Sequence, residues 1–202
     1  VLIGLGMLFM GLEHMSQSME PLRYMPEFTG LLAKFENPLL GIAVGAIFTA
    51  VIQSSSASVG ILQTLALSGV VTLPSAIYVL FGQNIGTCIT AILASIGSER
   101  NAKRATLIHL LFNVIGTVIF VAISMTTPFV HWMEGLTPGN VPVQIANVHT
   151  IFNVVTTFLL LPFGAQLVRL TYVFLPDLPQ APAPSVVRHL DFNIFNQEYH
   201  VG

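Results

Sequence analysis

Two clusters of polar side chains interrupt apolar stretches of this sequence, and both carry groups that can hold small ions. The first is Gln53-Ser54-Ser55-Ser56, and the second is Gly82-Gln83-Asn84-Ile85-Gly86-Thr87. Where a helix breaks inside a membrane, the free N–H groups that begin the next half-helix suit an anion. The free carbonyls that end the preceding half-helix, with Ser and Thr hydroxyls, suit a hard cation such as Na⁺. The clusters therefore predict a site for an anion and a cation.

The side chains in and beside the clusters supply ligands without formal charge. They are hydroxyls beside free backbone amides, and amides that both donate and accept: Gln53, Ser54, Ser55, Ser56, Gln83, Asn84, Thr87 and Thr90. No Lys or Arg lies near them in the sequence, so we expect cotransported cations to balance the charge of a bound anion. The alternative interpretation is that the serines are merely small residues that allow close helix packing.

The composition indicates that a membrane protein positions these residues. Charged residues make up 8% of the 202 residues, whereas a soluble domain carries about 25%. No Asp, Glu, Lys, Arg or His occurs from Asn37 to Ser98, and such a stretch can face lipid or protein but cannot cover a surface in water. The net charge of −2 argues against binding to nucleic acid, which requires a basic surface. Because Cys88 is the single cysteine, neither an intrachain disulfide nor a multi-cysteine metal site is possible.

Each polar cluster lies between two apolar arms, and no arm reaches the roughly 20 residues of a membrane-spanning helix. The arms are 39–52 and 59–67 around the first cluster, and 74–81 and 88–96 around the second. This arrangement predicts two re-entrant or discontinuous helical elements, with breaks at 53–56 and 82–87. Gly41 and Gly45 recur at helical spacing in the first arm, which predicts the close approach of another helix.

Two full spans are predicted after the second cluster, over 105–125 and 143–168, with a kink at Pro162 in the later one. Three cations precede the first of these spans and favour a cytoplasmic location for their loop: Arg100, Lys103 and Arg104. The chain is therefore predicted to be an all-α, multi-pass membrane protein. Its predicted domains are a transmembrane domain over 1–175 and a proline-rich linker with a polar tail over 176–202.

The two predicted spans share a polar motif. The pattern His-x-x-Phe-Asn-Val-x-x-Thr begins at His109 and recurs at His149. Because its His and Asn are four residues apart, they lie on one helix face and give each span a polar stripe. The stripes could join helices by hydrogen bonds. They could also handle a ligand or a proton, as ionisable residues inside membranes often do.

The segment TAVIQSSSAS at 49–58, followed by GQNIGTCITA at 82–91, resembles the sodium/phosphate cotransporter family, the type II group with the QSSS signature. The resemblance covers about 1–175. It implies coupling of Na⁺ movement to the uptake of inorganic phosphate, through two inverted repeats whose facing QSSS hairpins form the site. This chain has one QSSS and resembles a single repeat, the second of bacterial members. The implied location is the cell inner membrane, which is the bacterial plasma membrane.

The resemblance adds Gly86 to the candidate residues and divides the candidates by role. The expected substrate-binding residues are Gln53, Ser54, Ser55, Ser56, Gln83, Asn84, Gly86 and Thr87. The expected Na⁺ ligands are Ser54, Ser55, Ser56, Thr87 and Thr90. The expected partners are phosphate, Na⁺, the lipid bilayer and a second QSSS repeat. That repeat is either a first half of a longer carrier, which we favour, or another copy of this chain.

Three other functions remain open from the sequence. A sodium-coupled carrier could take another small anion or a neutral solute, because neutral hydroxyls and amides do not by themselves select phosphate over sulfate. An intramembrane serine hydrolase could use a QSSS serine with His109 or His149 as its base. It would lack the G-x-S-x-G elbow, however, and clustered hydroxyls suit ligation better, so we expect no enzyme. The third is a structural remnant that does not transport.

Overall fold

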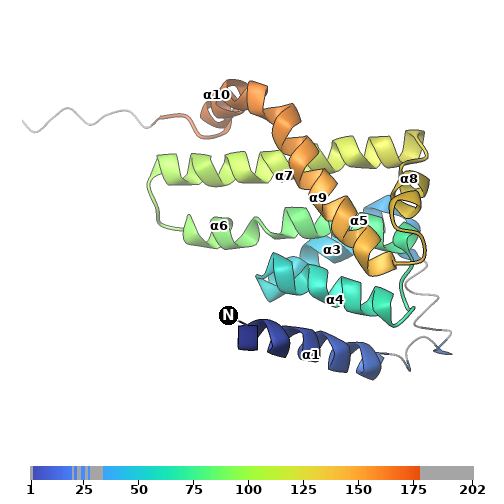
Figure 1. The fold of residues 1–202 in the computed structure, drawn as a ribbon. Helices are drawn as coiled ribbons and strands as arrows, with labels where there is room; N and C mark the ends of the chain where they lie inside the picture. The colour runs from blue at the N-terminus through green and yellow to red at the C-terminus, as the bar shows by residue number, and fades with distance from the viewer. Residues whose placement is uncertain (1, 20, 22–23, 26, 28–33, 178–202) are drawn as a thin grey trace, which may run out of the picture.

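The computed structural model describes residues 2–19, 21, 24–25, 27 and 34–177, and every regular element in these ranges is helical (Figure 1). The α-helices are α1 (Leu2–Met19), α3 (Pro38–Ile52), α4 (Ser55–Leu67), α5 (Leu73–Gly86), α6 (Ile89–Ala94), α7 (Arg100–Thr126), α8 (Phe129–Leu136), α9 (Val141–Leu160) and α10 (Gly164–Phe174). Short 3₁₀ turns are η2 (Lys34–Glu36) and η3 (Leu161–Phe163). The predicted all-α class is confirmed for these residues. Most of the predicted linker and tail lies outside the described residues.

In the part of the chain that the structure describes, three helical stretches are long and apolar enough to cross a membrane: Leu73–Ala94, Arg100–Thr126 and Val141–Phe174. The last two contain the spans predicted at 105–125 and 143–168. The first was not predicted as a span, because its polar cluster was interpreted as a break. Helices α3 and α4 are shorter apolar helices, of 15 and 13 residues.

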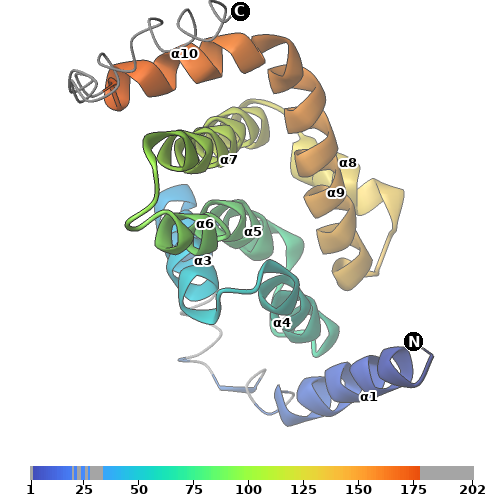
Figure 2. The ribbon, with the colours of Figure 1, turned by 90° about the vertical axis from the view of Figure 1, so that its left-hand side faces the viewer.

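The first predicted break is present. Helix α3 ends at Ile52, and Gln53 adopts a left-handed conformation with φ 58° and ψ 21°. Ser54 is extended, and its hydroxyl accepts a hydrogen bond from the N–H of Ala57 at 3.3 Å, which caps the start of α4. Ser55 and Ser56 belong to the first turn of α4. The interruption is therefore confined to Gln53 and Ser54, and the chain reverses there to place α4 beside α3 (Figure 2).

The second predicted break, at Gly82–Thr87, is wrong. Helix α5 continues through Gly86, and only a turn at Thr87 and Cys88, both with right-handed helical dihedrals, separates it from α6. Gly82 and Gly86 instead allow α5 to pack closely against α3. A Cβ on Gly82 would overlap the carbonyl of Ile42, and a Cβ on Gly86 would overlap the carbonyl of Ala46.

The same close contact explains the glycines of α3. A Cβ on Gly41 would lie 2.7 Å from the Cβ of Tyr78, and one on Gly45 would overlap the carbonyl of Val79. Helices α3 and α5 thus interlock through glycines spaced four apart on both partners, which lets their backbones approach as small residues do in membranes. The predicted close approach to Gly41 and Gly45 is confirmed, and α5 is the partner.

Beyond the contact between the two helices, α5 packs against more of the remaining helices than α3 does. Helices α7 and α9 pack against α5, and α9 also packs against α4 (Figures 1 and 2). A ring cluster of Phe81, Phe120 and Phe152 joins α5, α7 and α9, with centroids 5.0–5.8 Å apart. Pro162 lies in η3, where the chain changes direction between α9 and α10, so the predicted kink is confirmed.

Candidate functional site

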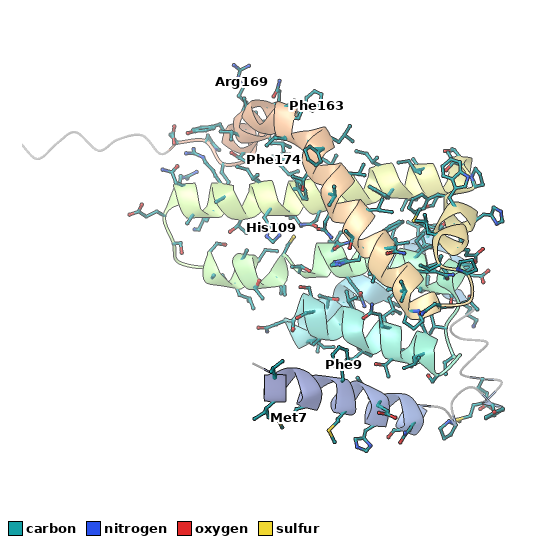
Figure 3. The ribbon with its side chains drawn as sticks, in the orientation of Figure 1. Met7, Phe9, His109, Phe163, Arg169 and Phe174 are labelled. Atoms are coloured by element: carbon teal, nitrogen blue, oxygen red, sulfur yellow. The ribbon has the colours of Figure 1, made fainter. Side chains whose placement is uncertain are left out.

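A polar pocket of about 240 Å³ lies where α4, α5, α7 and α9 meet. It brings together residues from the two polar clusters and from both copies of the repeated motif. Its lining residues are Ser55, Asn84, Thr87, His109, Phe112, Asn113, His149 and Asn153. None of them is Lys, Arg, Asp or Glu. His109 lies on the side of α7 that faces α5 and α6, whereas Arg169 on α10 points away from the bundle (Figure 3).

The break beside this pocket leaves backbone groups without helical partners. Gln53 still donates its N–H to the carbonyl of Thr49 at 2.8 Å, which closes α3. Within the described residues, the N–H groups of Ser54, Ser55 and Ser56 make no hydrogen bond, and neither do the carbonyls of 50–52 at the end of α3. A cluster of free donors therefore lies at the start of α4, next to a cluster of free acceptors at the end of α3.

The three serines of the run point in different directions, because successive residues of a helix differ by about 100°. Ser55 faces the polar pocket. Ser56 lines a separate hollow between α4 and α1, beside Gly11 and Met15. Ser54 caps α4, and its hydroxyl lies 3.5 Å from that of Ser56. Gln53 is exposed, and its side chain makes no hydrogen bond to a described residue.

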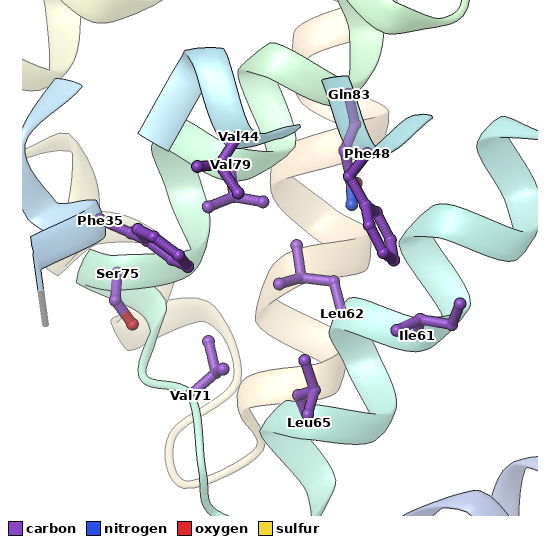
Figure 4. Close-up of a pocket in the computed structure, with 10 residues that line it drawn as sticks. All are labelled: Phe35, Val44, Phe48, Ile61, Leu62, Leu65, Val71, Ser75, Val79 and Gln83. Atoms are coloured by element: carbon purple, nitrogen blue, oxygen red, sulfur yellow. The ribbon is translucent and has the colours of Figure 1, made fainter. Parts of the chain in front are cut away.

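Behind the break, three buried side chains tie α3, α4 and α5 together. The hydroxyls of Thr49 and Ser58 are 2.7 Å apart, and Nε2 of Gln83 donates to the carbonyl of Ser58 at 3.1 Å. The Oε1 of Gln83 is buried and has no partner among the described residues. Gln83 also reaches an apolar cavity of about 220 Å³ between the same helices (Figure 4). Gln83 therefore packs between α3 and α4 and is not among the residues that line the polar pocket.

The other predicted residues in and after the second cluster lie in three places: the pocket, the contact with α3 and the surface. Asn84 and Thr87 line the pocket, where the hydroxyl of Thr87 donates to the carbonyl of Gln83 at 2.9 Å. Gly86 packs against α3. Thr90 is exposed, and its hydroxyl donates to the carbonyl of Thr87 at 3.2 Å.

The expected site residues did not include His109, Asn113, His149 and Asn153, although these residues belong to the repeated motif. The stripe on α7 does join helices: Thr117 donates to the carbonyl of Phe81 at 3.2 Å, and Nδ2 of Asn113 lies 3.4 Å from Sγ of Cys88. The stripe on α9 stays within its own helix, where Nδ2 of Asn153 donates to the carbonyl of His149 at 2.8 Å. The repeated motif was the signal for these residues, and only the fold shows that both copies face one pocket.

The described residues that line the pocket offer hydrogen bonds and include no Lys, Arg, Asp or Glu. Ser55 provides a hydroxyl, and the two imidazoles can donate or accept. Among the described residues, no group of three or more His, Cys, Asp or Glu is arranged to hold a metal ion. A cation here would therefore need the neutral oxygens of hydroxyls, amides and backbone carbonyls, which are ligands that hard cations accept.

The chain matches one protein family and several known proteins. The model of the Na⁺/Pi-cotransporter family matches residues 7–137. An uncharacterized protein of Bacillus subtilis, YqeW, is 33% identical over 86% of this chain and 56% of its own length. The putative inorganic phosphate export protein YjbB of Escherichia coli K12 is 28% identical over 94% of this chain and 34% of its own length.

A mammalian relative extends the comparison. The sodium-dependent phosphate transport protein 2B of Pongo abelii is 36% identical over 63% of this chain and 19% of its own length. The chain thus spans about half of the first bacterial relative and about a third of the second. No solved structure matches the chain.

Proposed function

Because this chain belongs to the Na⁺/Pi-cotransporter family, we propose that it takes part in sodium-coupled secondary transport of inorganic phosphate across the cell inner membrane. The family and two of the named relatives, YjbB and the transport protein 2B, concern phosphate transport, and the chain is not an enzyme. One relative is named as an export protein and another as sodium-dependent. Coupling to Na⁺ and transport into the cell are therefore both parts of the proposal.

One observation carries the proposal: the polar pocket unites Ser55 of the first cluster with Asn84 and Thr87 of the second. An anion there would meet the positive end of α4 and the free N–H groups that precede and begin it. Since no Lys or Arg is among the described residues that line the pocket, a bound anion would depend on a cation for charge balance. Cotransported Na⁺ would meet that need.

The proposed Na⁺ ligands are the free carbonyls at the end of α3 with the hydroxyls of the predicted set. Ser55 and Thr87 line the pocket and are well placed for this role. Ser54 and Ser56 lie within one helical turn of it. Thr90 has an exposed position beyond Thr87 and is the weakest member of the set.

We also propose that α3 and α4 form a re-entrant hairpin. At 1.5 Å per residue, their 15 and 13 residues extend about 22 and 20 Å, which is less than the roughly 30 Å of the hydrocarbon core. A second QSSS repeat would face this hairpin and complete the site, as inverted repeats do in carriers.

The test is uptake of radiolabelled phosphate into proteoliposomes, with a Na⁺ gradient or with choline in place of Na⁺. Ser55→Ala should reduce Na⁺-dependent uptake about tenfold, since it removes a hydrogen bond to a charged ligand. Ser98→Ala is the matched control, because Ser98 lies outside the pocket lining and its hydroxyl bonds the carbonyl of Ala94, and it should retain most of the uptake. Uptake that is the same in choline would refute sodium coupling.

A carrier for another small anion is the second candidate. The observation that favours it is the absence of formal charge in the pocket lining, because neutral ligands can accept several anions. Excess unlabelled sulfate that abolished phosphate uptake would support this candidate.

A further inference from the structure

Three asparagines in the polar pocket share one arrangement. Each amide nitrogen donates to the backbone carbonyl four residues earlier in its own helix. The bonds are Asn84 Nδ2 to Leu80 O at 3.3 Å, Asn113 Nδ2 to His109 O at 3.0 Å and Asn153 Nδ2 to His149 O at 2.8 Å. A carbonyl can only accept, so these bonds fix which end of each amide is nitrogen.

The arrangement leaves three amide oxygens for a ligand. Within the described residues, nothing donates to the Oδ1 of Asn84, Asn113 or Asn153, and all three residues line the pocket. Asn84 and Asn113 are each only 6% exposed, so bulk water reaches them little. These oxygens are acceptors that receive no hydrogen bond from a described residue, so a ligand that brings a donor to them gains a hydrogen bond.

Near neutral pH, tetrahedral oxyanions differ in whether they carry a proton. Inorganic phosphate and arsenate keep at least one O–H group, which can donate to an amide oxygen. Sulfate keeps none, so any of its oxygens that faces an amide oxygen would meet it as acceptor against acceptor. Sites built around such a donor discriminate strongly against analogues that lack it, because their own buried polar groups are then left unpaired.

We propose that Asn84, Asn113 and Asn153 select protonated oxyanions, phosphate above all, by accepting hydrogen bonds from the O–H of the ligand. This inference rests on the proposed function and names the residues that give it specificity. The deprotonated oxygens of the ligand would receive hydrogen bonds from Ser55 and from the ring N–H groups of His109 and His149. Donors and acceptors in one pocket of about 240 Å³ match an anion that both accepts and donates.

The experiment measures binding of phosphate, arsenate and sulfate to the purified protein by isothermal titration calorimetry at saturating Na⁺. Wild type should bind phosphate and arsenate at least about a hundredfold more tightly than sulfate. Asn113→Leu keeps the side-chain size but removes the acceptor. It should weaken phosphate binding about tenfold and leave sulfate binding unchanged, so the ratio of the two affinities should fall. Asn84→Leu and Asn153→Leu should act in the same way.

Two further variants separate this role from a structural one. Asn113→Asp keeps an acceptor but loses the nitrogen that donates to the carbonyl of His109 and adds a negative charge, so it should weaken the binding of both anions while it preserves the preference for phosphate over sulfate. Asn147→Leu is the matched control on α9, because Asn147 bonds Thr137 at 3.5 Å and lies outside the pocket lining. It should leave both affinities unchanged. Monodisperse gel filtration identifies variants that remain folded.

Several outcomes would overturn the inference. If phosphate is bound and transported but sulfate binds equally well, the selection is wrong while the proposed function stands. If the Leu variants weaken Na⁺ binding and leave the phosphate-to-sulfate ratio unchanged, the amide oxygens are cation ligands. If the wild type neither binds nor transports phosphate, the proposed function fails and the inference fails with it.

Discussion

The contact between α3 and α5 provides a sharp test of the fold, because glycine is required on both sides. In Gly82→Ala, the new methyl would lie 2.8 Å from both the carbonyl carbon and the Cα of Ile42, whereas carbon atoms pack best at about 3.5–4.0 Å. Both neighbours are backbone atoms, so the helices must separate by roughly 1 Å. Overpacking of this kind costs about 1–3 kcal/mol, and a gap of that size also forfeits a quarter to a half of the dispersion energy of the contacts it opens.

A gain in helix propensity offsets part of this cost. Because the new methyl meets backbone atoms of Ile42, which cannot move aside, we take the upper end of the overpacking cost, about 3 kcal/mol. Alanine is better than glycine by about 1 kcal/mol inside a helix, so we expect Gly82→Ala to lose about 2 kcal/mol net. For a chain of this size, 1 kcal/mol shifts the melting temperature by about 2–4 °C. The melting temperature in detergent should therefore fall by about 4–8 °C.

Gly135→Ala is the matched control. It lies in α8, where an added Cβ meets nothing within 4 Å, and it should raise the melting temperature by a few degrees through propensity alone. Differential scanning fluorimetry on both purified variants gives the comparison. A Gly82→Ala protein that melts at or above the wild-type temperature would show that α3 and α5 do not interlock as described.

Three further predictions concern the break and the end of the bundle. Thr49→Val should lower the free energy of unfolding by about 1–3 kcal/mol in chemical denaturation, because it leaves the buried hydroxyl of Ser58 without its partner. Gln53→Gly should raise the melting temperature slightly, because glycine adopts the positive φ without strain, and yet lower phosphate uptake if the amide serves the site. Arg104→Met should speed hydrogen exchange in α10, because it removes the bonds from the guanidinium to the carbonyl of Leu175 and to Asp177; unchanged exchange would contradict a role in holding that helix.

The sequence was sufficient for the helical class, for two of the three candidate spans and for the break at Gln53 and Ser54. Apolar length and lack of charge determine whether a helix can span a membrane, and both are properties of a single segment. The break was predictable because four consecutive polar side chains are costly in a continuous helix that faces lipid on all sides. Its extent was overestimated, since a serine can cap a helix and the next two can begin it.

The error at Gly82–Thr87 has a physical cause. Glycine beside amide side chains suggests a break when the sequence is considered alone, but glycine also allows two helices to touch. The choice between these roles depends on whether another chain segment approaches within contact distance. Here α3 does so, with its own glycines Gly41 and Gly45. Residues far apart in the sequence decide the outcome, and no local pattern contains that information.

The placement of the predicted site residues also bears on the proposed second repeat. Ser55, Asn84 and Thr87 reach the pocket, whereas Gln53 and Ser56 are exposed on the same hairpin. The side chain of Gln53 makes no hydrogen bond to a described residue, and the hydroxyl of Ser56 makes only the long bond of 3.5 Å to that of Ser54. The packing of the described residues therefore does not require an amide or a hydroxyl at these positions. An exposed amide and hydroxyl at a helix break are expensive in lipid. A facing QSSS hairpin would shield both and bring further hydroxyls to the same free N–H groups, so their exposure supports the proposal that a second repeat completes the site.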